Sequence, residues 1–75
     1  SKRSGLEFFC RYLDIDPQDA VTFGDGDNDR EMMAFSGRSV AVGNAVEELK
    51  RSASFVTRNS WDDGVAYAFE HYLGI

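Results

Sequence analysis

Four acidic residues lie within seven positions of a 75-residue chain, in the segment TFGDGDNDREMM (residues 22–33). Asp25, Asp27 and Asp29 alternate with a glycine and an asparagine, directly after a short apolar run. Glycine permits tight turns, and carboxylate oxygens are the ligands that hard divalent cations prefer. Without a cation, carboxylates so close together repel one another and raise each other's pKa. The pattern therefore predicts a divalent metal site, and a solvated acidic turn that merely caps a helix is the simpler alternative.

The spacing of the acids also bears on which metal would bind. Asp25, Asp27 and Asp29 occupy the first, third and fifth positions of a calcium-binding EF-hand loop. That loop needs a glycine where this chain has Arg30 and a glutamate where it has Ser36, so the EF-hand interpretation fails. Magnesium needs only one or two protein carboxylates and takes water or phosphate oxygens at its other positions. The sequence therefore favours Mg²⁺.

The composition limits the class of protein. An apolar fraction of 43% is too high for a disordered segment and is typical of a chain that packs. A chain of this length forms one small domain with marginal stability, so we expect a further part to complete it. A net charge of −5 argues against nucleic acid or an anionic membrane surface as a partner. No apolar run reaches the roughly 18 residues of a membrane span and no signal peptide is visible, so we expect a cytoplasmic protein.

Apolar periodicity predicts the elements that hold the acidic segment. The predicted helices cover residues 4–13, 29–35 and 44–53 and a last helix that begins at Ser60, and the predicted strands cover residues 20–24, 38–43 and 54–57. Ser4 with Glu7 and Asn44 with Glu47 have the form of helix caps, and Gly37 is expected to close the second helix. The single Cys10 lies on an apolar helix face, where we expect it to be a small buried hydrophobe.

One helix followed by three strand–helix pairs predicts an α/β fold, with a parallel sheet between layers of helices. In such a sheet the loops at the carboxyl ends of the strands lie along one edge, where ligands bind. The loops after Phe23, Val42 and Thr57 meet this description. We therefore expect the acidic segment to lie at a ligand-binding edge beside the GNA turn (residues 43–45) and the segment RNSWDDG (residues 58–64).

Four segments of the chain carry a resemblance to a known family: SK at the start, GDGDNDREMM (residues 24–33), VAVGNAVEELKRSASFVT (residues 40–57) and DDGVAYAFEHYL (residues 62–73). They resemble the C-terminal part of the core domain of a haloacid dehalogenase (HAD) superfamily phosphatase, of the Cof-like sugar-phosphatase group. The resemblance covers nearly the whole chain, and GDGxND followed by GNA at this spacing is specific. It implies a Rossmann-like three-layer parallel sheet, of which residues 1–75 form the C-terminal half with no second domain.

The resemblance also implies an activity and a set of roles. Such enzymes share a nucleophilic aspartate in DxDGT, a Ser or Thr, a Lys and the acidic GDxxND loop, and only the last two are present here. It implies a Mg²⁺-dependent phosphatase that hydrolyses a small phosphorylated metabolite through an aspartyl-phosphate intermediate. Lys2 would hold the transferring phosphoryl group, Asp25 would bind Mg²⁺ directly, and Asp29 would act on the metal through water. Asn28 and Asn44 would lie near the substrate phosphate.

The nucleophile would then belong to the missing N-terminal half of the core domain, which becomes the expected partner of this chain. Two positions depart from the family pattern, because Arg3 stands where glycine is common and Asp27 occupies a variable position with no expected ligand role. The alternative function is a non-catalytic binding or interaction module that retains the metal or phosphate loop. The lack of a strand followed by the DxDGT motif within these 75 residues favours this alternative. In either case we expect the 75-residue chain alone to be inactive.

Overall fold

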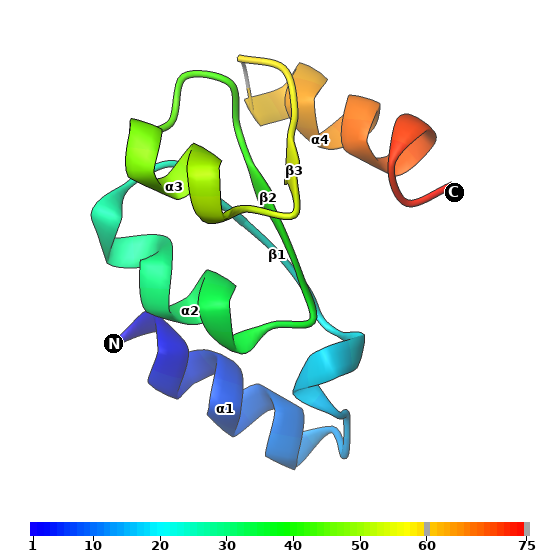
Figure 1. Cartoon of the computed structure of the whole chain (residues 1–75). Helices are drawn as coiled ribbons and strands as arrows, with labels where there is room; N and C mark the ends of the chain where they lie inside the picture. The colour runs from blue at the N-terminus through cyan, green and yellow to red at the C-terminus, as the bar shows by residue number, and fades with distance from the viewer. Residues whose placement is uncertain (60, 75) are drawn as a thin grey trace.

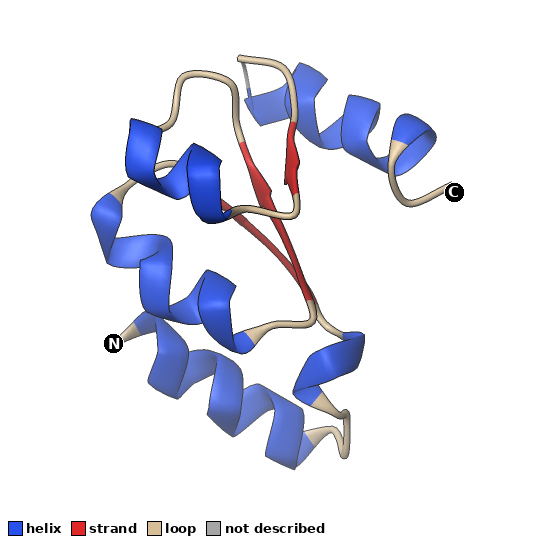
Figure 2. Cartoon of the chain, in the orientation of Figure 1, coloured by secondary structure: helices blue, strands red, loops and turns tan. Residues whose placement is uncertain are grey.

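A three-stranded parallel β-sheet with helices on both faces forms the centre of the computed structural model, which describes residues 1–59 and 61–74 (Figure 1). The elements are α1 (Lys2–Tyr12), β1 (Val21–Gly24), α2 (Arg30–Phe35), β2 (Arg38–Ala41), α3 (Glu47–Ser52), β3 (Phe55–Val56) and α4 (Trp61–His71), with short 3₁₀-helices at Pro17–Asp19 and Asp27–Asp29. Figure 2 shows α2 and α3 on one side of the sheet and α4 on the other. The predicted α/β fold is therefore confirmed, and the predicted cap Ser60 lies outside the described residues.

The register of the sheet assigns its side chains to two faces. Phe23, Val40 and Phe55 are partners across the three strands. Phe23 contacts Phe69 of α4 and Phe55 stacks on Tyr72, with ring centroids 6.1 and 4.7 Å apart. Because successive strand residues point to opposite faces, the neighbouring positions face α2 and α3. The buried core on that side consists of Met33, Ala41, Val42, Ala45 and Leu49.

Both predicted helix caps differ from the structure. The hydroxyl of Ser1 accepts a hydrogen bond from the backbone N–H of Ser4 (3.2 Å), so the cap of α1 lies three residues earlier than predicted and Ser4 lies inside the helix. The carboxylate of Glu7 pairs with Arg3 at 2.9 Å instead of capping the helix. The predicted Asn44 cap is also wrong, because α3 begins at Glu47 and has no side-chain cap.

Gly37 has a different role from the predicted one. The helix α2 ends at Phe35, and Ser36 already has extended backbone angles (φ −79°, ψ 158°). A Cβ atom at position 37 would lie 1.8 Å from the carbonyl oxygen of Gln18, so only glycine lets the chain pass this close to the preceding 3₁₀-helix. The N–H of Gly37 donates to the carbonyl oxygen of Pro17 at 2.9 Å, and this crossing leads the chain into β2 beside β1.

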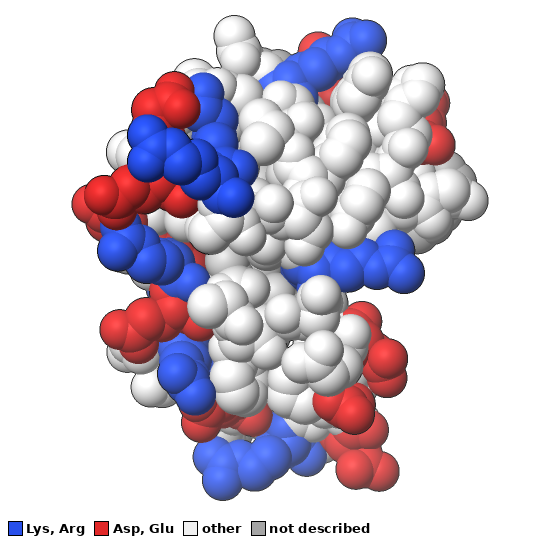
Figure 3. All heavy atoms as spheres, in the orientation of Figure 1, with Lys and Arg blue, Asp and Glu red and all other residues white. Residues whose placement is uncertain are grey.

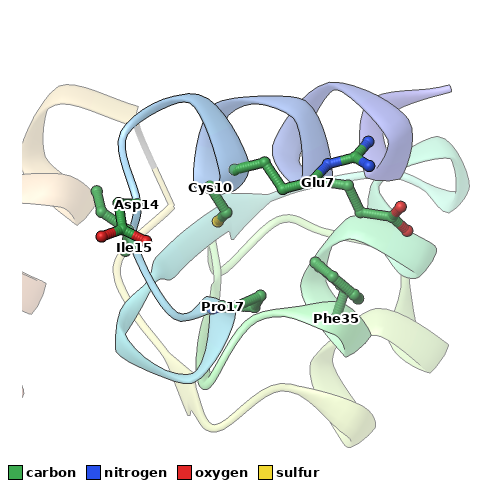
Figure 4. Close-up of a pocket in the computed structure, with 7 residues that line it drawn as sticks. Glu7, Cys10, Asp14, Ile15, Pro17 and Phe35 are labelled. Carbon is green, nitrogen blue, oxygen red and sulfur yellow. The ribbon is translucent and has the colours of Figure 1, made fainter.

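The apolar face of α1 is only partly covered. Cys10 is buried as predicted, and Figure 4 shows its sulfur in the groove between α1 and the side chains of Pro17 and Phe35. Phe9 and Leu13 belong to the same predicted apolar face but are 61% and 57% exposed. The reason is that α1 packs against α2, while the sheet ends at the edge strand β1.

Charged side chains are mixed on the surface. On the face shown in Figure 3, Lys and Arg side chains lie beside Asp and Glu side chains along one border, over α1, α2 and α3, and uncharged side chains fill the middle. Within the described part of the chain, each helix is too short or too polar to cross a lipid bilayer.

Candidate active site

The acidic segment lies at the carboxyl edge of the sheet, where β1 ends and the 3₁₀-helix Asp27–Asp29 leads into α2. Two backbone hydrogen bonds join the three loops at this edge. The N–H of Val46, before α3, donates to the carbonyl oxygen of Asp25 (3.1 Å). The N–H of Gly43, after β2, donates to the carbonyl oxygen of Arg58 (3.0 Å), which follows β3. Residues from the three loops therefore form one continuous surface, as the parallel topology predicted.

Asp29 is the most buried charged residue of this surface, with 3% of its area exposed. Its Oδ2 atom accepts hydrogen bonds from the backbone N–H groups of Asp25 (3.0 Å) and Gly26 (3.3 Å). Its Oδ1 atom accepts a hydrogen bond from the Nζ of Lys2, at the start of α1, and the two groups form an ion pair. A Cβ atom on Gly24 would lie 2.7 Å from the Cβ of Asp29, so the glycine makes room for this carboxylate. The fold thus brings Lys2, Asp25 and Asp29 together.

The pKa of Asp29 lies below its ordinary value of 3.8. Burial is the largest single influence and acts alone to raise the pKa, because it disfavours the charged form. The hydrogen bond from Lys2, those from the N–H groups of Asp25 and Gly26, and the charge of Lys2 lower the pKa and together outweigh burial. Lys2 therefore supplies the positive charge that keeps Asp29 ionised among the neighbouring carboxylates.

The three alternating acids differ in how their charges are balanced. Asp29 pairs with Lys2, and Asp27 pairs with Arg30 at 2.8 Å. The carboxylate of Asp25 is exposed and has no hydrogen bond or ion pair with any other residue in the described part of the chain. Its oxygens are therefore the ones available to a cation from solvent. Within residues 1–59 and 61–74, however, no three His, Cys, Asp or Glu side chains converge on one point as a complete set of metal ligands.

The two predicted asparagines border this group. Asn28 is exposed in the 3₁₀-helix and lines a hollow with Lys2, Arg3 and Asp27. Asn44 is exposed in the turn between β2 and α3. In the same loop, the N–H of Val46 donates to the carbonyl oxygen of Asp25. The structure therefore joins Lys2, Asp25 and Asp29 through direct contacts, and places Asn28 and Asn44 on the two connected loops around them.

One residue that the sequence analysis did not single out also contacts this edge. The Nζ of Lys50, in α3, donates to the carbonyl oxygen of Gly43 (3.1 Å) and pairs with Glu47 (3.1 Å). The spacing of Glu47 and Lys50 indicates a surface pair within a helix, which is common. No sequence pattern indicates that Lys50 reaches back seven residues to a backbone carbonyl.

Comparison with known proteins places these features in a family. The model of a family described as haloacid dehalogenase-like hydrolase matches residues 1–69. The "Putative phosphatase YkrA" of Bacillus subtilis is 47% identical over 75 residues, which cover all of this chain and 29% of that protein. A "Phosphoglycolate phosphatase" of Methanobrevibacter smithii is 36% identical over 73 residues, which cover 97% of this chain and 31% of that protein.

A solved structure gives the same result in three dimensions. The structure of the HAD subclass IIB sugar phosphatase BT4131 superposes with a TM-score of 0.91 at 33% sequence identity, over all of this chain and 29% of that one. The chain thus spans less than a third of the length of each of these three relatives.

Proposed function

The chain belongs to the haloacid dehalogenase-like hydrolases, and we propose that it is the C-terminal segment of the core domain of a Mg²⁺-dependent phosphatase acting on a small phosphorylated metabolite. The observation that carries the proposal is the ion pair between the half-exposed Lys2 and the buried carboxylate of Asp29, beside the carboxylate of Asp25, which is exposed and unpaired among the described residues. In phosphoryl transfer an anionic nucleophile approaches an anionic phosphate, so the site needs positive charge on both sides of the reacting phosphorus. A fixed ammonium and a free carboxylate that can hold a cation provide this.

Each polar residue of the site has a role in the proposal. The ammonium of Lys2 donates to the oxygens of the transferring phosphoryl group and balances the charge that develops on them. Asp29 orients that ammonium, because its buried carboxylate is itself fixed by two backbone N–H groups. The side-chain amides of Asn28 and Asn44 donate to the substrate phosphate from the adjoining loops.

The donor set at the edge fits Mg²⁺, with different roles for two acids. Asp25 would hold the ion directly, because its carboxylate is exposed and unpaired within the described residues. Both oxygens of Asp29 already accept hydrogen bonds from the protein, so this residue would contact the ion only through water. Bound Mg²⁺ neutralises charge between the attacking carboxylate and the phosphate. Asp27 is held by Arg30 and contributes no ligand.

The proposal places the nucleophilic aspartate outside these 75 residues, on a strand beside β1. It would form the aspartyl-phosphate intermediate that water then hydrolyses. β1 is an edge strand of the described sheet, and Val21 and Phe23 line a groove along it with Phe69 and Leu73. A further parallel strand would cover this groove and bring its carboxyl end next to Asp25.

The substrate class rests on the relatives. One is named a phosphoglycolate phosphatase and another a sugar phosphatase, and both names describe the hydrolysis of a small phosphorylated compound. We extend this class, a sugar phosphate or a similar metabolite, to the protein that contains this chain. The competing function is a module that binds a metal or phosphate without catalysis, because these 75 residues contain no DxDGT motif.

Asp25→Asn in the complete protein tests the proposal. The wild-type protein should hydrolyse a generic aryl phosphate with Mg²⁺, and Asp25→Asn should lower kcat by about 100-fold or more, the usual effect of removing one electrostatic contributor to a transition state. Asp27→Asn removes the same charge two positions away and should keep most of the activity. Near-normal turnover of Asp25→Asn at limiting Mg²⁺ would contradict the metal assignment. A wild-type protein that binds Mg²⁺ and hydrolyses no phosphate ester would favour the non-catalytic module.

A further inference from the structure

Lys50 takes part in the chain of hydrogen bonds that joins the three loops of the site. Its Nζ donates to the carbonyl oxygen of Gly43 (3.1 Å), while the N–H of the same glycine donates to the carbonyl oxygen of Arg58 (3.0 Å). Three residues later, the N–H of Val46 donates to the carbonyl oxygen of Asp25 (3.1 Å). The turn between β2 and α3 is thus attached to the loop after β1, to the loop after β3, and to α3 through Lys50.

The surroundings of Lys50 suit a structural contact more than a free surface charge. Only 25% of its side-chain area is exposed, and Glu47, one helical turn before it, balances its charge at 3.1 Å. The neighbouring Leu49 is fully buried in the core and anchors α3 to the sheet. Lys50 therefore extends from a fixed position on the helix toward the carbonyl of Gly43.

Gly43 is held on its other side as well. A Cβ atom at this position would lie 2.2 Å from the side-chain oxygen of Asn59 and 3.0 Å from the carbonyl oxygen of Thr57. The backbone of Gly43 therefore lies in close contact with the loop after β3, and Lys50 holds its carbonyl from the side of α3. Asn44 follows directly, so the same contacts set the orientation of its peptide group.

We propose that Lys50 is a positioning residue for the substrate, which fixes the Gly43 carbonyl and thereby the side-chain amide of Asn44 without touching substrate or metal. This inference rests on the proposed function, in which Asn44 donates to the substrate phosphate. The lysine acts on binding of the phosphate rather than on the transfer step, since Lys2 pairs with Asp29 and the N–H of Asp25 is bonded to the same carboxylate, so these three residues keep contacts outside the turn.

Lys50→Met tests the inference, because it removes the ammonium and keeps an unbranched side chain. In the complete protein it should raise KM for the phosphorylated substrate about five- to tenfold, the effect of losing one hydrogen bond, and leave kcat within about twofold. Arg51→Met removes the same charge one position along α3 and should change neither constant by more than about twofold. Lys50→Arg can still donate to the carbonyl of Gly43, so its KM should lie between those of wild type and Lys50→Met.

Amide hydrogen exchange of residues 43–46 gives a measurement that does not depend on activity. Lys50→Met should speed exchange at Gly43 and Val46 by about five- to tenfold, and Arg51→Met should not. Unchanged exchange in Lys50→Met overturns the inference, as does an unchanged KM in an active protein.

If Lys50→Met fails to fold, Lys50→Arg and Lys50→Gln replace it in both assays. A KM and an exchange rate equal to wild type in Lys50→Gln then overturn the inference. An inactive wild-type protein refutes the proposed function and the substrate role together, and the exchange result then still decides whether Lys50 fixes the turn.

Discussion

Replacing Asp29 with alanine should destabilise this chain through the loop between β1 and α2. The Asp29 carboxylate accepts hydrogen bonds from the backbone N–H groups of Asp25 and Gly26, and it forms an ion pair with Lys2. Water reaches the exposed Asp25 and the half-buried Gly26, so each lost backbone bond should cost about 1 kcal/mol. Half of the Lys2 side chain is exposed, so solvent screening limits the contribution of the ion pair to stability to less than about 1 kcal/mol. The expected total is about 2–3 kcal/mol.

A loss of this size is large for 75 residues, because domains of this length have about 4–11 kcal/mol of stability. Urea unfolding followed by circular dichroism measures it. Asp27→Ala is the matched control, because it removes an exposed carboxylate from the same loop. The ion-pair partner of Asp27, Arg30, is also exposed, so the loss of stability should be less than about 1 kcal/mol. Asp29→Asn keeps the shape of the side chain and should fall between wild type and Asp29→Ala.

The difference in unfolding free energy between wild type and Asp29→Ala should depend on pH with a definite sign. The pKa of Asp29 is lower in the folded chain than its ordinary value of 3.8, so its charged form stabilises the fold above that pH. The contribution is lost as the pH falls through the lower pKa of the folded state. The gap between wild type and Asp29→Ala should therefore be constant at neutral pH and narrow below pH 3.8. The reasoning is wrong if Asp29→Ala unfolds at the same urea concentration as Asp27→Ala, or if the gap widens in acid.

Two further predictions concern catalysis and assembly. Lys2→Ala in the complete protein should lower kcat more than it raises KM, because the ammonium matters most when the phosphoryl group is in transfer; steady-state kinetics would contradict this role by showing a raised KM alone. The isolated chain should show no turnover of an aryl phosphate with Mg²⁺, and light scattering should find it self-associated through the exposed edge of β1 or bound to the missing half. A strictly monomeric chain with enzymatic turnover would require a nucleophile among residues that we assign to metal, cap or core.

The order of elements could be predicted from apolar periodicity, but the helix ends could not. A Ser or Asn followed by Glu three residues later occurs at Ser4 and at Asn44, and neither is a cap. In α1 the helix continues back to Lys2, whose Nζ reaches Asp29, so a contact distant in sequence extends it. At Asn44 the adjoining backbone forms a turn, with the N–H of Ala45 bonded to the carbonyl of Val42 at 2.9 Å. In α1 a different local cap, Ser1, and the distant Lys2–Asp29 pair replace the predicted cap, and at Asn44 a local backbone turn replaces it.

The acidic segment and its edge of the sheet could also be predicted, whereas the different surroundings of its acids could not. Asp25 and Asp29 have the same side chain and lie in one turn, yet one is exposed and the other is 3% exposed. The difference depends on space beside Gly24, where a Cβ atom would lie 2.7 Å from the Cβ of Asp29. The importance of Lys2 was inferred from the family resemblance alone, since a lysine at position 2 has no local pattern that marks it.

The incomplete burial of α1 shows what an apolar pattern can specify. Cys10 and Leu6 face the fold, while Phe9 and Leu13, at helical spacing from them, are largely exposed because α1 packs mainly against α2. An amphipathic pattern indicates that one face of a helix is covered, but it does not indicate which part of the protein covers that face. A parallel strand added at β1 would extend the sheet beneath this part of α1, because crossover helices pack on the strands they connect. The same strand would carry the nucleophile to the carboxyl edge beside Asp25. Under the proposed function, the exposed apolar residues of α1 and the carboxylate of Asp25 would both lie next to this added strand.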